Sequence, residues 1–198
     1  MPHLIKSKLH PAAISIGSVT VLSLYGFSNQ GISMIGNTKN KAVVTNYSPQ
    51  MAAFLATIRW AETGTSGYDS YRKLVFNGTF NDFSTHPKVR QCARVSGRNV
   101  CSTAAGAYQM LDISWNDLQP DLGLKDFSPP SQDKMAIEYI RRNKAIDDVE
   151  SGNVEMAFCK VGKVWASLIC NDYEQHPKTV EELRNYYNQQ LIKRFSEF

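Results

Sequence analysis

The sequence lacks the motifs by which nucleotide- and metal-dependent enzymes are usually recognised. It has no glycine-rich phosphate loop and no nucleophile elbow. Its four histidines stand at no metal-ligand spacing from one another or from the cysteines. His86 and His176 each precede a proline, which favours a place in a turn over metal ligation. We therefore expect neither a metal ion nor another cofactor.

The sequence also lacks long blocks of like charge, internal repeats and low-complexity tracts. Its net charge is +4, from 22 lysines and arginines against 18 aspartates and glutamates in 198 residues. This excess is too small to predict a nucleic-acid partner, but it favours approach to an anionic polymer or a cell envelope. The length suits one domain with a tail, which we expect to be a monomer.

One uncharged run, at residues 11–27, follows a short region that contains Lys6, Lys8 and His10. This order is typical of a secretory signal peptide. The run is shorter than the about 20 apolar residues of a spanning helix. No small-x-small cleavage site follows it, however, so a cleaved signal at residues 1–27 and an uncleaved membrane anchor both stay open. No polar face accompanies the run, which disfavours a buried helix, and we expect export to the periplasm or cell envelope.

The tail and the domain differ in amino-acid composition. Residues 28–47 are polar and show no sustained period, which predicts a linker. The domain then occupies residues 48–198, where 42% hydrophobic and 11% aromatic content in the whole chain is enough for a core.

The sequence has four cysteines, whose pairing would indicate whether the protein works in an oxidising compartment. A hairpin that turns at Ser96–Gly97 would place Cys92 directly opposite Cys101, within reach of a disulfide. The segment between Cys159 and Cys170 is predicted to be mostly helical, so that pair is too far apart unless the chain doubles back. An even count agrees with an oxidising compartment, and buried free thiols are the alternative.

The strongest helix signal runs from Ser48 to Gly64. Ser48 is suited to cap the N-terminus, Pro49 fits the first helical position, and Gly64 can adopt the left-handed conformation that ends a helix. One stripe recurs along it at steps of four, three and four: Met51, Leu55, Ile58 and Glu62.

The last member of this apolar stripe is a carboxylate. Burial and the negative end of the helix dipole both disfavour the charge on Glu62, so both raise its pKa. A carboxyl group that stays protonated near neutral pH is suited to general acid catalysis. The plainer interpretation is a solvated glutamate in the last turn.

The rest of the domain is predicted to be mostly helical. Residues 73–80 predict a hairpin with a type I′ turn at Asn77–Gly78. Further helices are predicted from apolar stripes at residues 108–118 (Met110, Ile113, Leu118), after a cap at Ser128–Pro129 (Ala136, Ile137, Ile140), at residues 154–168 (Val154, Phe158, Val161, Trp165, Leu168), and after the capping box Thr179–Glu182 (Leu183, Tyr187, Leu191, Phe195). The predicted fold class is therefore α+β, mostly α, with a small β-hairpin region after the first helix.

Five segments carry a resemblance to a known family: FLATIRWAETGT (54–65), FNDFSTHP (80–87), STAAGAYQML (102–111), LGLKDFSPPSQD (122–133) and VWASL (164–168). Together they resemble the lambda-type phage lysozymes of glycoside hydrolase family 104, within the lysozyme-like superfamily. Their order and spacing hold from about residue 50 to residue 195. The resemblance implies a lysozyme-like domain of two lobes at residues 48–198, with a cleft between the lobes.

The resemblance also implies a reaction. Members of this family are lytic transglycosylases, which cleave the β-1,4 bond between N-acetylmuramic acid and N-acetylglucosamine in peptidoglycan and leave 1,6-anhydro-muramic ends. Glu62 falls on the family's single catalytic acid. Ser102, Tyr108 and Gln109 fall on its cleft wall, and Tyr173 falls where the family has an aromatic residue that stacks on a sugar.

This sequence departs from the family in two places. Ile169–Cys170 follows Leu168, and Glu174 stands between Tyr173 and Gln175, so the geometry of the Tyr173 loop is not carried over. The segment at residues 90–101 is also unlike the family. The small residues at 104–106 fit either a close approach to glycan or a packing contact between lobes.

A hydrolytic lysozyme is the main alternative. Such an enzyme needs a second carboxylate about 5–5.5 Å (retaining) or about 6.5–9.5 Å (inverting) from the acid, and Asp69, Asp82 and Asp112 are available. Each of them is also explained as a turn or surface residue. A binding module without turnover is a third interpretation, against which the retention of Glu62 with Tyr108 and Gln109 argues.

Overall fold

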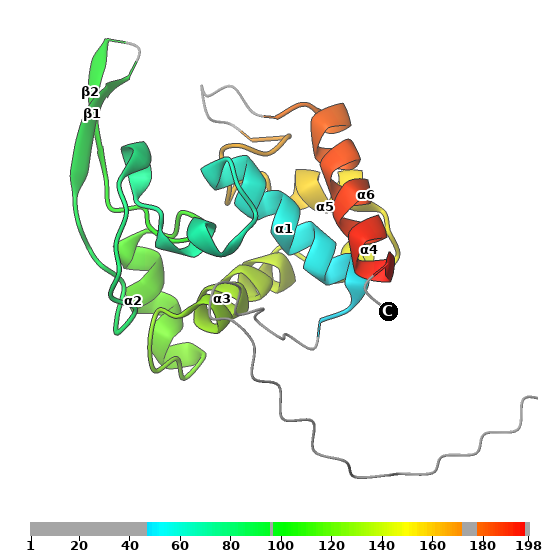
Figure 1. Cartoon of the computed structure of the whole chain (residues 1–198), viewed down its shortest axis with the longest axis horizontal. Coiled ribbons are helices and arrows are strands. Elements are labelled where there is room, and N and C mark those ends of the chain that lie inside the picture. Colours follow the sequence, from blue (N-terminus) through cyan, green and yellow to red (C-terminus); the bar gives the residue numbers. More distant parts are fainter. Residues whose placement is uncertain (1–46, 96, 172–177, 197–198) are drawn as a thin grey trace, which may run out of the picture. The chain divides into compact units, whose positions relative to one another are not determined.

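The computed structural model describes residues 47–95, 97–171 and 178–196 (Figure 1). The helices are α1 (Pro49–Thr63), α2 (Asp112–Asp121), α3 (Pro129–Arg142), α4 (Ile146–Glu150), α5 (Val154–Val161) and α6 (Val180–Ser196); two short 3-10 turns are η1 (Tyr68–Arg72) and η2 (Val75–Asn77), and the strands are β1 (Gln91–Val95) and β2 (Arg98–Ser102). The predicted fold class is confirmed. The predicted signal or anchor and the linker up to residue 46 lie outside the described residues and stay predictions.

Helix α1 forms the centre of the domain and begins and ends where the sequence predicts. The Ser48 hydroxyl accepts a hydrogen bond from the Met51 amide at 3.0 Å. Gly64 adopts φ 76°, and its amide donates to the Trp60 carbonyl at 2.8 Å. The buried surface of α1 is wider than the predicted stripe, because Phe54 and Thr57 are fully buried as well. The helix is therefore enclosed by protein on most sides, with α6 and α4 packed against it.

The β1–β2 hairpin has the predicted register. Cys92 pairs with Cys101 and Val95 with Arg98, and a disulfide joins the cysteines across a Cα–Cα distance of 4.0 Å. In Figure 1 the hairpin extends away from the helices, and seven of its ten strand residues are exposed. It therefore contributes little to the core.

The predicted hairpin at residues 73–80 is wrong in the position of its turn. The left-handed residues are Phe76 and Asn77, one position earlier than predicted, and Gly78 has φ −71°. Lys73 forms a bridge with Thr79, and the Leu74 amide donates to the Gly78 carbonyl at 2.8 Å. A Cβ on Gly78 would lie 2.6 Å from the side-chain nitrogen of Gln91, which is the end of a flexible side chain.

Two predicted helices have other bounds than their apolar stripes suggest. The predicted helix at 108–118 begins only at Asp112, so Met110 is buried outside it and Ile113 is 69% exposed. The helix predicted through residue 168 ends at Val161. Trp165 and Leu168 are buried, but they belong to the segment that follows. In both places tertiary packing buries apolar residues of irregular chain, which imitates a helical stripe.

The early end of α5 explains the second disulfide. The chain doubles back after Gly162 and brings Cys170 to a Cα–Cα distance of 4.9 Å from Cys159, where a disulfide joins them. The reversal is tight, since a Cβ on Gly162 would lie 2.0 Å from the Ile169 carbonyl oxygen. The predicted Cys92–Cys101 disulfide is therefore present, the Cys159–Cys170 pair is joined because the chain does double back, and the described residues contain no free cysteine.

Helix α6 begins with the predicted capping box. The Glu182 amide donates to the Thr179 hydroxyl at 3.1 Å, and the Glu182 carboxylate accepts from the Thr179 amide at 2.8 Å. Leu183 and Tyr187 are buried as predicted, whereas Phe195 is 59% exposed because it lies in the last turn of the helix. Among the residues that the structure describes, no helix is both long enough and apolar enough to cross a membrane.

Candidate active site

Glu62 lies in the last turn of α1 and is half-buried. The Ser167 hydroxyl donates a hydrogen bond to its carboxylate oxygen Oε1. Ser167 comes from the segment after α5 that the Cys159–Cys170 disulfide closes. Two segments more than 100 residues apart in the sequence thus meet at the candidate acid.

The pKa of Glu62 is raised, as the sequence predicts. Burial is the main cause, because it disfavours the charged form of the carboxyl group. The hydrogen bonds from Ser167 oppose this shift, since they stabilise the carboxylate. A carboxyl group with a raised pKa and one hydroxyl donor can both give and take a proton.

A buried polar cluster, formed by Arg59, Tyr71, Tyr108 and Asp133, connects α1 to the rest of the site. Arg59 Nη1 donates to the Tyr108 hydroxyl at 2.9 Å and lies 3.8 Å from Asp133 Oδ1. The hydroxyls of Tyr71 and Tyr108 donate to that same Asp133 oxygen at 2.8 and 2.5 Å. Burial acts to lower the pKa of Arg59, but the nearby Tyr108, Tyr71 and Asp133 raise it overall, so the guanidinium stays charged.

Sequence reasoning missed this cluster and Ser167. Arg59 was open to detection, because it stands one residue after Ile58 on a helix otherwise rich in apolar residues, three positions before Glu62. Asp133 and Ser167 have no such local signal. Their partners are distant in the sequence, and only packing brings them together.

The segment at residues 104–110 forms a wall beside the cluster. Ala105 pairs with Met110 through amide–carbonyl hydrogen bonds of 2.9 Å in both directions. Gly106 has φ 78°, and a Cβ there would lie 2.2 Å from the Gln132 side-chain oxygen. That oxygen accepts from the Ala107 amide at 2.8 Å. Ala104 and Ala105 are buried as well, so these small residues serve packing between elements.

The predicted substrate-binding residues lie in and beside this wall. Ser102 and Gln109 are half-buried, and Gln109 Nε2 donates to the Gly106 carbonyl at 2.9 Å. The Tyr108 side chain is only 1% exposed and belongs to the buried polar cluster, so in this structure it supports the wall from behind. Tyr173 lies outside the described residues.

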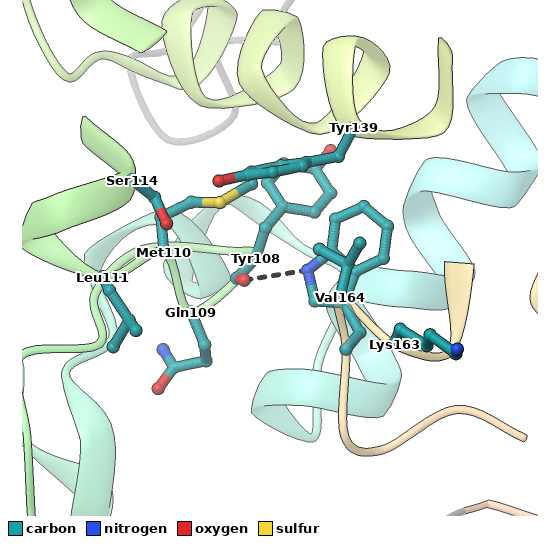
Figure 2. Close-up of a pocket in the computed structure, with 9 residues that line it drawn as sticks. Tyr108, Gln109, Met110, Leu111, Ser114, Tyr139, Lys163 and Val164 are labelled. Atoms are coloured by element: carbon teal, nitrogen blue, oxygen red, sulfur yellow. Dashed lines mark hydrogen bonds between the residues drawn. The ribbon is translucent and has the colours of Figure 1, made fainter. Parts of the chain in front are cut away.

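A pocket of about 260 Å³ opens along the wall (Figure 2). Residues 108–111 line one side and residues 163–165 line the other, with Ser114 and Tyr139 from α2 and α3. Trp165 Nε1 donates to the Tyr108 carbonyl at 3.1 Å and joins the two sides. Glu62 does not line this pocket. The two are connected through the chain, because residues 163–165 line the pocket and Ser167, two residues further on, binds Glu62.

Two of the candidate second carboxylates have local partners of their own. Asp82 is exposed and accepts from the Ser84 amide and hydroxyl at 2.8 and 2.9 Å. Asp112 accepts from the Thr103 hydroxyl at 2.6 Å. These hydrogen bonds lower the pKa of each carboxyl group. Asp69 is exposed in η1.

Within the described ranges, no three His, Cys, Asp or Glu side chains are placed to hold a metal ion. A central helix that ends in a glutamate of raised pKa, followed by a small β region and then a helical part, is the arrangement of a lysozyme-type glycosidase.

Comparison with known proteins agrees with this class. The family model described as Endolysin matches residues 52–193. The endolysin of Escherichia phage P2 is 35% identical over 155 residues, which cover 71% of this chain and 92% of that protein. The endolysin of Escherichia phage lambda is 33% identical over 139 residues, which cover 68% of this chain and 86% of that protein.

The fold agrees as well. The structure of bacteriophage lambda lysozyme complexed with a chitohexasaccharide superposes with a TM-score of 0.66 at 29% identity, over 74% of this chain and 97% of that one. A second lysozyme structure from bacteriophage lambda gives a TM-score of 0.60 at 26% identity, over 76% and 96%. The chain belongs to the Endolysin family and is a peptidoglycan-cleaving glycosidase of the lysozyme type.

Proposed function

We propose that the chain is a lytic transglycosylase that cleaves the β-1,4 bond between N-acetylmuramic acid and N-acetylglucosamine, with Glu62 as its single acid and base. The observation that carries this proposal is the environment of Glu62: a half-buried carboxyl group of raised pKa, held by a hydrogen bond from the Ser167 hydroxyl. The chitohexasaccharide bound to the related phage lysozyme supports a glycan as the ligand.

The reaction needs no water. The protonated Glu62 gives its proton to the glycosidic oxygen, and the bond from that oxygen to the anomeric carbon of the muramic sugar breaks. The C6 hydroxyl of the same sugar attacks that carbon and gives its proton to the Glu62 carboxylate. The products are a free 4-hydroxyl group and a 1,6-anhydro ring, and the acid is regenerated for the next cycle.

Ser167 has two roles in this scheme. Its hydroxyl orients the carboxyl group of Glu62, and it stabilises the carboxylate that forms after the first proton transfer. The substrate supplies its own nucleophile, so its orientation in the site must be correct before the bond breaks. We propose that Ser102, Gln109, the main chain of Tyr108 and Tyr173 provide that orientation.

The test is the product of peptidoglycan digestion. Mass spectrometry is expected to show 1,6-anhydro-muropeptides; reducing ends in their place would show that the enzyme is a hydrolase that uses a second carboxylate. The Glu62→Gln variant is expected to bind glycan without cleaving it. Glu181→Gln, an exposed glutamate in α6, is the matched control and should cleave normally. Full activity of Glu62→Gln would refute the role of the acid.

The remaining proposals concern location. The predicted leader at residues 1–27 would take the enzyme to the periplasm or cell envelope, where its substrate lies. Sequencing the N-terminus of the exported protein would distinguish a cleaved signal from an anchor, and sedimentation equilibrium would test the monomer.

A further inference from the structure

The positive charge of this chain is concentrated in one segment. Between Asp82 and Asp112 the sequence has no acidic residue and four basic ones, which are Lys88, Arg90, Arg94 and Arg98. Their charge equals the net charge of the whole chain, +4, so the remainder of the chain is neutral in balance. All four lie in or immediately before the β1–β2 hairpin.

Among the residues that the structure describes, the three hairpin arginines differ from the other arginines in having no partner. Arg90, Arg94 and Arg98 are exposed, and they form no hydrogen bond or ion pair with any residue that the structure describes. By contrast, five arginines elsewhere each donate to a protein oxygen: Arg59, Arg72, Arg141, Arg142 and Arg184. The hairpin guanidinium groups are thus available to a ligand.

The hairpin presents these groups on a stiff support. The disulfide and the paired register fix the strands, and side chains alternate between the two faces. Arg90 and Arg94 therefore share the face of the disulfide, about 13 Å apart for four residues of strand. Arg98, opposite Val95, lies on the other face near the turn.

The hairpin is also continuous with the wall of the candidate active site. Ser102, the last residue of β2, pairs with Gln91, and the wall begins two residues later. Leu74 bridges to Ala105 and fixes this junction to the chain before the hairpin. A polymer that lies along the wall would therefore pass near the base of the hairpin.

We propose that the hairpin arginines bind the carboxylates of the peptides that substitute the muramic sugars of peptidoglycan. This inference rests on the proposed function. Guanidinium groups pair well with carboxylates, because their planar forks donate two parallel hydrogen bonds. Residues 84–102 contain no Phe, Trp or Tyr that could anchor the hairpin in a bilayer interface, which favours a peptide carboxylate over a lipid phosphate.

The test compares soluble glycan oligomers that carry their peptides with the same oligomers after an amidase has removed them. The wild type is expected to have the lower KM for the peptide-bearing form. In Arg90→Gln/Arg94→Gln/Arg98→Gln that KM should rise about 5- to 10-fold, to the value for the peptide-free form.

The matched control is Lys125→Gln/Lys134→Gln/Lys144→Gln, which removes the same charge from exposed positions outside the hairpin and should keep the preference. Equal loss in this control would show that only net charge matters, and would overturn the proposal. So would a wild type with equal KM for both oligomers.

Binding of the same oligomers by the Glu62→Gln variant, followed by fluorescence anisotropy, separates this inference from the proposed function. A preference for the peptide-bearing form that depends on the arginines supports the hairpin site even if the reaction is not the one proposed. If the triple arginine variant instead loses only its binding to vesicles of anionic phospholipid, the ligand is a lipid headgroup and the inference is wrong.

Discussion

Two regions of this molecule use arginine in opposite ways. Arg59 is buried at the end of α1, where Tyr108 and Asp133 surround its guanidinium group. The arginines of the β1–β2 hairpin are exposed and unpartnered among the described residues. The first stands three positions before the candidate acid in the sequence, and the others lie in or just before the hairpin that leads into the wall.

The difference follows from the cost of burying a charge. A buried guanidinium must have its hydrogen bonds satisfied by protein, so the donors of Arg59 are used within the fold and are not available to a ligand. An exposed guanidinium is hydrated at little cost and can exchange water for a ligand. Burial therefore separates the charges that position the site from those that can recognise the substrate.

The largest effect is expected from breaking the buried polar cluster. Asp133→Ala leaves Arg59 charged and unpaired in the interior, which should lower the free energy of unfolding by about 3–5 kcal/mol. Urea denaturation measures this. Asp147→Ala, an exposed aspartate in α4, is the control and should change it by less than about 0.5 kcal/mol. An Asp133→Ala protein as stable as the wild type would show that the cluster is not needed for stability.

The next effect distinguishes the two disulfides. Replacing Cys159 and Cys170 by alanine should lower the free energy of unfolding by about 2–3 kcal/mol, because the loop that they close carries the buried Trp165. The same change at Cys92 and Cys101 should cost less than about 1 kcal/mol, since the exposed hairpin can open without uncovering the core.

Activity assays sharpen the same comparison. Only the Cys159/Cys170 variant should lose turnover on peptide-free glycan, because Ser167 lies in its loop. Equal losses of stability and turnover in the two variants would contradict the separation between a positioning region and a recognition region.

Removing the Ser167 hydroxyl should reduce the rate by about 10-fold, since Glu62 loses its orienting donor. The pKa of Glu62 also fixes the direction in which the pH dependence of the rate should change. Ser167 lowers the pKa of Glu62, so Ser167→Ala raises it further, and the alkaline limb of the rate profile moves to higher pH. Ser84→Ala, which removes an exposed hydroxyl, should leave the profile in place. An unchanged limb in Ser167→Ala would show that this hydrogen bond does not act on the acid.

The smallest effect concerns the residue that leads into the hairpin. His86 is fully buried, its Nδ1 accepts from the Lys88 amide at 3.0 Å, and burial lowers its pKa. The unfolded chain therefore takes up a proton first as pH falls below about 6.5. The stability that neutral His86 contributes is present above that pH and is lost as pH falls toward the lowered pKa.

Urea denaturation between pH 7.5 and 5.5 measures this loss, which should be about 1 kcal/mol or less. His86→Gln should lack this part of the pH dependence. A variant with the pH dependence of the wild type would assign the effect to other groups.

Local patterns predicted those parts of the fold that depend on neighbouring residues. The ends of α1, the capping box of α6 and the register of the hairpin all follow from groups a few residues apart, so the sequence alone specifies them. The turn after Lys73 did not follow its Asn–Gly signal, since its left-handed residues are Phe76 and Asn77 and Gly78 has φ −71°.

The first helix, the acid at its end and the likeness to a family of glycosidases could all be read from the residues alone. The partners of Glu62 and of Arg59, which are Ser167 and Asp133, follow from tertiary packing instead. Ser167 and Asp133 reach the end of α1 from segments far along the chain, and their contacts depend on a chain reversal after Gly162 and on the packing of α3. The hydrophobic periodicity of the sequence does not predict such contacts, because they are made between elements whose relative positions depend on the packing of the whole core.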